Sequence, residues 1–129
     1  MSRQYDREYT YAADGVPQVR IREGTTVEGS EVIRFVRQIE YRIDGEWQPV
    51  VRYDHGPSEG EHDVGEEGLH IDVYRHGSKD EEHSGPIALP ENPTRALTRA
   101  EDDLRERFEE HVKRFERWHD LNPDRNSSP

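Results

Sequence analysis

The chain has 129 residues and carries 29 acidic against 18 basic side chains, a formal net charge of −11, which leaves room for one domain with a modest core. The absence of cysteine excludes disulfides and thiol chemistry, and no apolar run is long enough to cross a bilayer. Because the N-terminus also lacks a signal-peptide core, we expect a cytoplasmic protein that does not associate with membranes.

The basic residues are almost all arginine, since only Lys79 and Lys113 are lysine. An acidic surface with few lysines is typical of proteins from salt-loving archaea. High net charge keeps such proteins soluble where molar salt screens repulsion within about 3 Å. We therefore expect a halophilic archaeal source, and we interpret the acidity as adaptation to salt rather than as the mark of a basic partner.

The N-terminal part shows weak patterns. Residues 1–15 have tyrosines scattered among charges, without a clear period, and predict a flexible N-terminal arm with at most one edge strand. Alternation in residues 16–23 indicates a weak strand, and the glycines of 24–29 predict a turn. We expect residues 16–120 to form a single domain.

A β-hairpin is the clearest local prediction. Apolar and aromatic residues occupy alternate positions from Ile33 to Tyr41 and again from Trp47 to Tyr53. A three-residue loop, 43–45, keeps both sets on one face, with Gly45 in the left-handed position. It places Phe35 opposite Tyr53 and Arg34 opposite Asp54. A two-residue loop at Asp44-Gly45 would oppose Phe35 with Asp54, which makes that register unfavourable.

A third alternating run and a helix complete the predicted fold. Leu69, Ile71 and Val73 share one side of the third run, and His70, Asp72 and Tyr74 share the other. Asn92-Pro93 provides an N-cap and a first-turn proline for a helix from about 94 to 118 with one apolar face. The prediction is an α+β fold: a small antiparallel sheet of three or four strands, with a long C-terminal helix packed on one face. Residues 121–129 are expected to form a disordered tail.

The candidate site lies around the loop that follows the hairpin. Histidines beside carboxylates can exchange protons near neutral pH, and a nearby arginine can stabilise a phosphate in its transition state. We expect catalytic roles for His55, His62, His70, Arg52 and Asp54, and substrate contacts from Arg34, Tyr53 and Tyr74. The alternative is that the face carries only paired surface charges, such as Arg34 with Asp54.

The same stretch contains residue types that ligate metals. Histidine and aspartate occur at 54, 55, 62, 63, 70 and 72. Their spacing matches no closed zinc pattern, so we predict no metal and no cofactor.

A family resemblance adds to this interpretation. The runs Glu40-Tyr41-Arg42-Ile43 and Val51-Arg52-Tyr53-Asp54, followed by histidines, resemble the TumE-like toxins of prokaryotic toxin–antitoxin pairs. Those are small α+β proteins in which an Arg-Tyr-Asp run closes a strand and a His-rich segment follows. The resemblance covers roughly 35–69, and a similarity to small uncharacterised haloarchaeal proteins spans more of the chain. It implies RNA-directed growth inhibition, an RNA substrate and a partner antitoxin.

Two functional hypotheses stay open. The first is a toxin-like, RNA-directed growth inhibitor, in the form of a metal-independent ribonuclease in which a histidine transfers protons and Arg52 contacts phosphate. The alternative is a non-catalytic protein-interaction module of a halophilic archaeon, whose sheet face or edge strand binds a partner. The net acidity disfavours unaided binding of nucleic acid.

Overall fold

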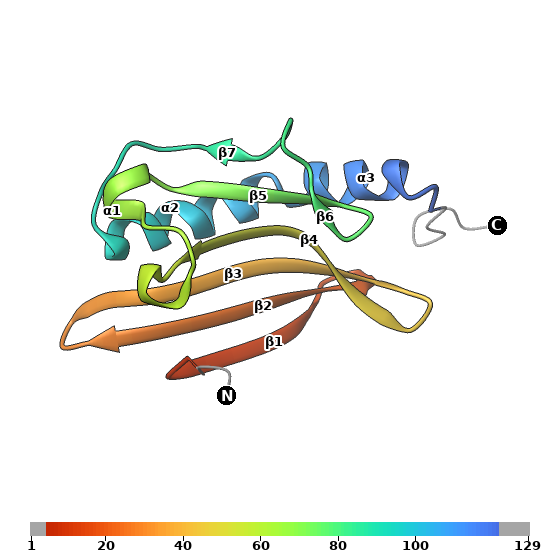
Figure 1. The fold of residues 1–129 in the computed structure, drawn as a ribbon. Coiled ribbons are helices and arrows are strands. Elements are labelled where there is room, and N and C mark those ends of the chain that lie inside the picture. Colours follow the sequence, from red (N-terminus) through yellow and green to blue (C-terminus); the bar gives the residue numbers. More distant parts are fainter. Residues whose placement is uncertain (1–4, 122–129) are drawn as a thin grey trace.

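The structure is a computed structural model that describes residues 5–121, and it shows an antiparallel sheet with helices on one face (Figure 1). The strands are β1 (Arg7–Ala13), β2 (Val16–Glu28), β3 (Glu31–Ile43), β4 (Glu46–His55), β5 (His70–Arg75), β6 (Ser78–Lys79) and β7 (Gly85–Pro86). The helices are the 3₁₀ turn η1 (Pro57–Glu59), α1 (Val64–Glu67), α2 (Pro93–Glu106) and α3 (Phe108–Trp118).

The sheet is larger than the sequence predicted. In the described part of the chain it has seven strands in the order β1-β2-β3-β4-β5-β6, with β7 also paired to β5. The expectation of three or four strands with one long helix is therefore wrong. The two short strands, β6 and β7, have two residues each and lie outside the three predicted alternating runs.

The N-terminal residues account for much of the difference. Residues 7–13, expected in a flexible arm, form the edge strand β1 and pair with β2. All of them except Ala13 are exposed, so no apolar alternation reveals the strand. The ring of Tyr5 is buried against Gly24, where a Cβ atom would come within 2.6 Å of it. Gly24 therefore belongs to β2, and the turn predicted at 24–29 is confined to residues 29–30.

The hairpin between β3 and β4 also differs from its prediction. Asp44 and Gly45 both have positive φ (52° and 82°) and form a two-residue turn, which Asp-Gly favours. Val50 is an extra residue on β4, and this bulge shifts every later pair by one position. Phe35 consequently lies opposite His55, not opposite Tyr53 or Asp54. Because of the bulge, odd-numbered residues of β3 still lie opposite odd-numbered residues of β4 beyond Val50. We had expected a three-residue loop to produce that alignment.

The C-terminal helical region is divided in two. Asn92 caps α2 as predicted, because its side chain accepts a hydrogen bond from the N–H of Arg95 at 2.9 Å. Arg107 departs from helical geometry (φ −109°, ψ 14°) and separates α2 from α3. Hydrogen bonds continue across the break, from Arg107 N–H to the carbonyl of Asp103 and from His111 N–H to the carbonyl of Arg107.

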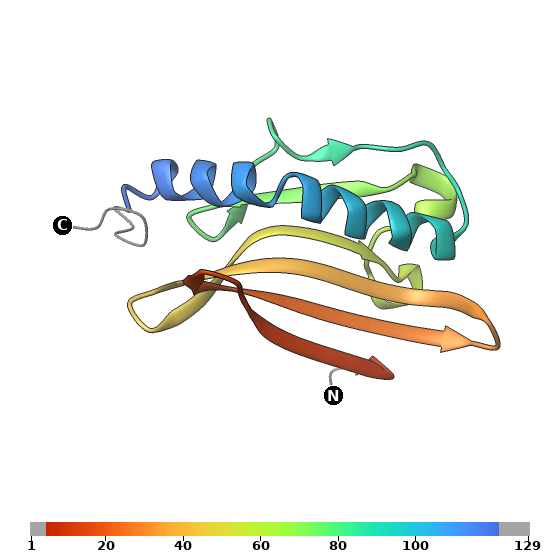
Figure 2. The same cartoon turned by 180° about the vertical axis from the view of Figure 1, so that it is seen from behind.

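The core lies between the sheet and these two helices (Figure 2). Leu69, Ile71 and Val73 of the third predicted run are buried in it, which confirms the predicted side of that strand. The largest fully buried side chains include Tyr53, Phe35, Phe115, Ile39 and Leu69. No helix within residues 5–121 is long and apolar enough to cross a membrane. Except for Leu121, the predicted tail lies outside the described residues.

Candidate functional site

The face of the sheet opposite α2 and α3 carries a layer of polar side chains. The connection from β4 to β5 crosses this face at η1, whereas α2 and α3 lie on the other face (Figures 1 and 2). The same connection then forms α1, which contacts α2 and places Val64 in the core. A cavity of about 520 Å³ opens here. We call it the polar pocket, and it is lined by Arg52, Asp54, Gly60, Glu61, His62, Glu67, Asp72, Tyr74 and Lys79.

Glu61 links the residues at one end of this region. Its Oε1 lies 2.9 Å from Nε of Arg34, and its Oε2 lies 3.0 Å from Nη2 of Arg52. The phenol of Tyr5 donates a third hydrogen bond to Oε2 at 3.1 Å. A side chain at Gly56 would collide with this carboxylate, since a Cβ atom there would lie 2.1 Å from Oε1. Glycine at that position therefore permits the approach of Glu61 to both arginines.

Asp54, on strand β4, makes hydrogen bonds to two residues that line the polar pocket. Its Oδ2 accepts a hydrogen bond from Nε of Arg52 at 2.6 Å, and its Oδ1 accepts one from the N–H of His62 at 3.0 Å. Asp54 does not pair with Arg34 as the predicted register required, because Val36 is its cross-strand partner. The carboxylate thus ties the loop to the strand beneath it.

His62 lies between two carboxylates. Its Nε2 is 3.2 Å from Oδ1 of Asp72, and its Nδ1 is 3.2 Å from Oε1 of Glu67. The hydrogen bond with Asp72 raises the pKa of His62 to about 9, against the opposing effect of burial. The Nζ of Lys79 lies 3.5 Å from the same Asp72 carboxylate. At neutral pH this imidazole is therefore a cation that can donate a proton from either ring nitrogen.

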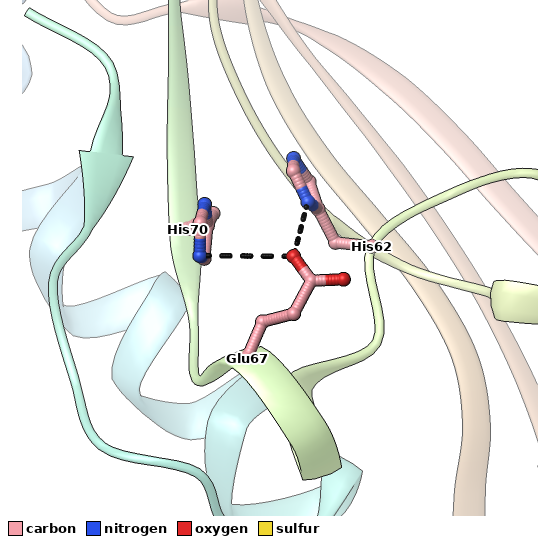
Figure 3. Close-up of side chains that lie close together, drawn as sticks. All are labelled: His62, Glu67 and His70. Carbon is pink, nitrogen blue, oxygen red and sulfur yellow. Dashed lines mark hydrogen bonds and ion pairs between the residues drawn. The ribbon is translucent and has the colours of Figure 1, made fainter.

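His70 lies beside His62 at the start of β5. The two rings stack with centroids 4.7 Å apart, and Nε2 of His70 lies 3.7 Å from Oε1 of Glu67 (Figure 3). A nitrogen of each imidazole, Nδ1 of His62 and Nε2 of His70, therefore lies close to Oε1 of Glu67.

Two predicted site residues lie on the other face. His55 is opposite Phe35 in the core, and its Nδ1 accepts a hydrogen bond from the N–H of Val64 at 3.0 Å. Burial lowers the pKa of His55, so it is a neutral anchor for α1. Tyr53 donates its hydroxyl proton to Oδ2 of Asp103 on α2 at 2.6 Å, and burial raises its pKa. Neither side chain lines the polar pocket.

The other six predicted residues gather at this site. Arg52, Asp54, His62 and Tyr74 line the pocket, whereas Arg34 and His70 contact residues that line it. Burial raises the pKa of the half-buried Tyr74 phenol. Sequence reasoning missed four contributors: Tyr5, Glu61, Glu67 and Lys79. The available signal was that Glu67 lies three residues before His70 in the chain; the turn at Gly68, between α1 and β5, brings the two side chains together.

Most charges of the pocket are paired, with a small excess of acidic groups. Its four carboxylates, Asp54, Glu61, Glu67 and Asp72, face Arg52, Lys79 and the protonated His62. An anionic ligand must displace a carboxylate from Arg52 or Lys79, whereas a cation is attracted by the excess of acidic groups. The arrangement can exchange protons through His62 and can bind positive charge.

A second cavity, of about 650 Å³, lies beside the helical layer. Its walls come from β1, β2, β3, α2 and the start of α3, and its apolar contributors include Tyr11, Ile21, Leu104 and Phe108. We call it the apolar groove. It borders the edge strand β1, on which Tyr9 and Tyr11 are 61% and 46% exposed.

Fold and site together define a small α+β protein whose antiparallel sheet is covered by helices on one face and carries a buried polar network on the other. Residues 3–121 match the model of DUF7718, a domain of unknown function, and the chain therefore belongs to that family. Neither the curated proteins nor the solved structures contain a match to the chain.

Proposed function

We propose that the protein is a toxin-like, RNA-directed growth inhibitor of a prokaryotic toxin–antitoxin pair, acting in the cytoplasm of a haloarchaeon. The observation that carries this proposal is the hydrogen bond between His62 and Asp72 in a pocket that also contains Arg52 and Lys79. An oriented imidazole beside two long cationic side chains is suited to proton transfer next to a phosphate.

The proposed reaction is the cleavage of an RNA phosphodiester. His70 removes the proton of a ribose 2′-hydroxyl, and the 2′-oxygen forms a bond to phosphorus. His62 donates a proton to the departing 5′-oxygen as the P–O5′ bond breaks, which leaves a 2′,3′-cyclic phosphate. Arg52 contacts the non-bridging oxygens after exchanging a carboxylate for the phosphate. Each acid–base group would contribute about 10²–10⁴-fold to the rate.

The test is expression in a halophilic host. Wild type should slow growth, whereas His62→Ala and His70→Ala should not. His83→Ala is the matched control, because His83 pairs with Asp80 outside the pocket. Purified wild type should also produce RNA ends with a cyclic phosphate in the presence of a chelator. Equal growth with all four proteins, at equal levels of folded protein, would contradict the proposal.

The second candidate is a protein-interaction module, favoured by the exposed edge strand β1 and the adjoining apolar groove. A partner strand can pair with the free edge of β1 and place apolar side chains in the groove. An antitoxin would use the same surface under the first proposal. Tyr9→Lys with Tyr11→Lys should abolish co-purification of the protein encoded by the neighbouring gene, and unchanged co-purification would exclude this surface.

A further inference from the structure

Three ligand-type side chains converge at the mouth of the polar pocket. Nδ1 of His62, Nε2 of His70 and a carboxylate oxygen of Glu67 all lie within 4.8 Å of one another. Oε1 of Glu67 is 3.2 Å from the first nitrogen and 3.7 Å from the second (Figure 3). Ligands in a tetrahedral zinc site are about 3.3 Å apart when the metal–ligand distances are about 2.0–2.1 Å. The two distances to Oε1 of Glu67 are thus close to the spacing that a metal ion requires, and all three atoms lie near enough for small side-chain movements to complete the site.

From this geometry we propose that His62, Glu67 and His70 form a binding site for a divalent transition-metal ion, with Zn²⁺ as its representative. Two imidazoles and one carboxylate are the donor set that suits such ions, and three protein ligands leave a position open for water or substrate. The inference does not rest on the proposed ribonuclease function, since it needs only the placement of these three side chains.

The contacts behind the ligands orient two of them. Asp72 lies 3.2 Å from Nε2 of His62 and holds the N–H at Nε2, so a metal ion would displace the proton of Nδ1, which faces Glu67. Oε2 of Glu67 accepts a hydrogen bond from the N–H of Asp63 at 3.4 Å, so that Oε1 faces the histidines. Metal-binding histidines typically have such a carboxylate partner on the second nitrogen. A simple surface ion pair would not require these hydrogen bonds behind His62 and Glu67.

The backbone between the ligands is firmly held. Val64, at the start of α1, is fully buried and hydrogen-bonded to His55, and Asp63 caps the helix by accepting from the N–H of Gly65. Gly68 ends α1 with a left-handed φ of 83°, in a place where a Cβ atom would lie 2.1 Å from the carbonyl oxygen of Ala88. The turn at Gly68 places His70 beside Glu67, so the three ligands come from nine consecutive residues on an anchored segment.

Metal binding is measured directly on tag-free, chelator-treated protein. Titration calorimetry with ZnCl₂ in buffer without phosphate should show one ion per chain, with a dissociation constant on the order of 1 μM or lower. Co²⁺ should produce visible absorption bands characteristic of a low-symmetry site. Both readouts are independent of RNA cleavage, so the metal site and the proposed function can fail separately.

Four variants locate the site. Asp72→Asn should weaken Zn²⁺ binding about 10–100-fold by releasing the orientation of His62. His70→Ala and Glu67→Gln, which remove a ligand, should weaken it further. His83→Ala should bind as wild type does, although His83 also contacts a carboxylate. Glu67 is exposed, so Glu67→Gln leaves the core intact and circular dichroism can verify folding. Wild type without saturable binding, or ligand variants that bind like His83→Ala, would overturn the proposal.

Discussion

The hydroxyl of Tyr53 donates a hydrogen bond to Oδ2 of Asp103 at 2.6 Å and thereby joins strand β4 to helix α2. Because side chains alternate along β4, the Arg52-Tyr53-Asp54 run is divided between the two faces of the sheet. Arg52 and Asp54 point into the polar pocket, and Tyr53 points into the helical layer. The central residue of the run therefore has a structural contact rather than a place in the pocket.

Tyr53→Phe tests the importance of this contact for stability. Loss of the hydroxyl leaves Asp103 without its shortest hydrogen bond, and we expect a loss of about 1 kcal/mol in the free energy of unfolding. Tyr11→Phe is the control, because it removes an exposed phenol–carboxylate hydrogen bond of 2.8 Å to Glu23 and should cost less. Urea denaturation measures both, and equal losses would contradict the assignment.

Glu61→Ala tests the ion network at the polar pocket. The substitution removes the carboxylate that Arg34, Arg52 and Tyr5 share, and the side chain of Glu61 is only 13% exposed. We expect the free energy of unfolding to fall by about 2–3 kcal/mol. Glu59→Ala, two residues away and exposed, should change it by less than about 0.5 kcal/mol. Similar denaturation midpoints for the two variants would show that the network contributes little.

His111 predicts a stability change in mild acid. Burial, followed by repulsion from Arg114 and Arg107, lowers its pKa to about 3 from an ordinary 6.5, against the attraction of Glu110. Between these values the unfolded chain binds a proton that the folded protein does not, so stability falls as the pH drops from 6.5. The slope attributable to this group is at most about 1.4 kcal/mol per pH unit.

His111→Gln checks this assignment, since glutamine does not titrate. Thermal melts of wild type and variant between about pH 7 and pH 5 should show a smaller pH dependence for the variant. His62, whose pKa is raised to about 9 in the folded protein, contributes stability that decreases as the pH rises above 6.5. Wild type and variant share this contribution, so it cancels when the two proteins are compared. Parallel curves for the two proteins would contradict a neutral, buried His111.

The net charge of −11 predicts a response to salt. If the acidic surface is adapted to brine, screening relieves its self-repulsion, and the melting temperature should rise between dilute buffer and about 2 M KCl. Differential scanning calorimetry across that series measures the effect. A flat or falling melting temperature would contradict a halophilic origin.

Sequence reasoning succeeded where a feature depends on a few neighbouring residues. The sides of the third strand followed from the alternation of Leu69, Ile71 and Val73, and the start of α2 followed from Asn92-Pro93. It failed at β1, whose exposed residues carry no alternation, and at Gly24, which looked like a turn residue but is required by the ring of Tyr5. That requirement comes from a residue 19 positions away, which a local pattern does not reveal.

By itself, the sequence determined which side chains could share a strand face, because side-chain direction alternates with a period of two whatever the strand pairs with. Only the tertiary structure decided which of them meet. The bulge at Val50 turned His55 toward Phe35 and away from the pocket, and the close approach at Gly56 brought Glu61 to two arginines. A single inserted residue changes the register of all later pairs, so these distances depend on the folded backbone and not on spacing along the chain.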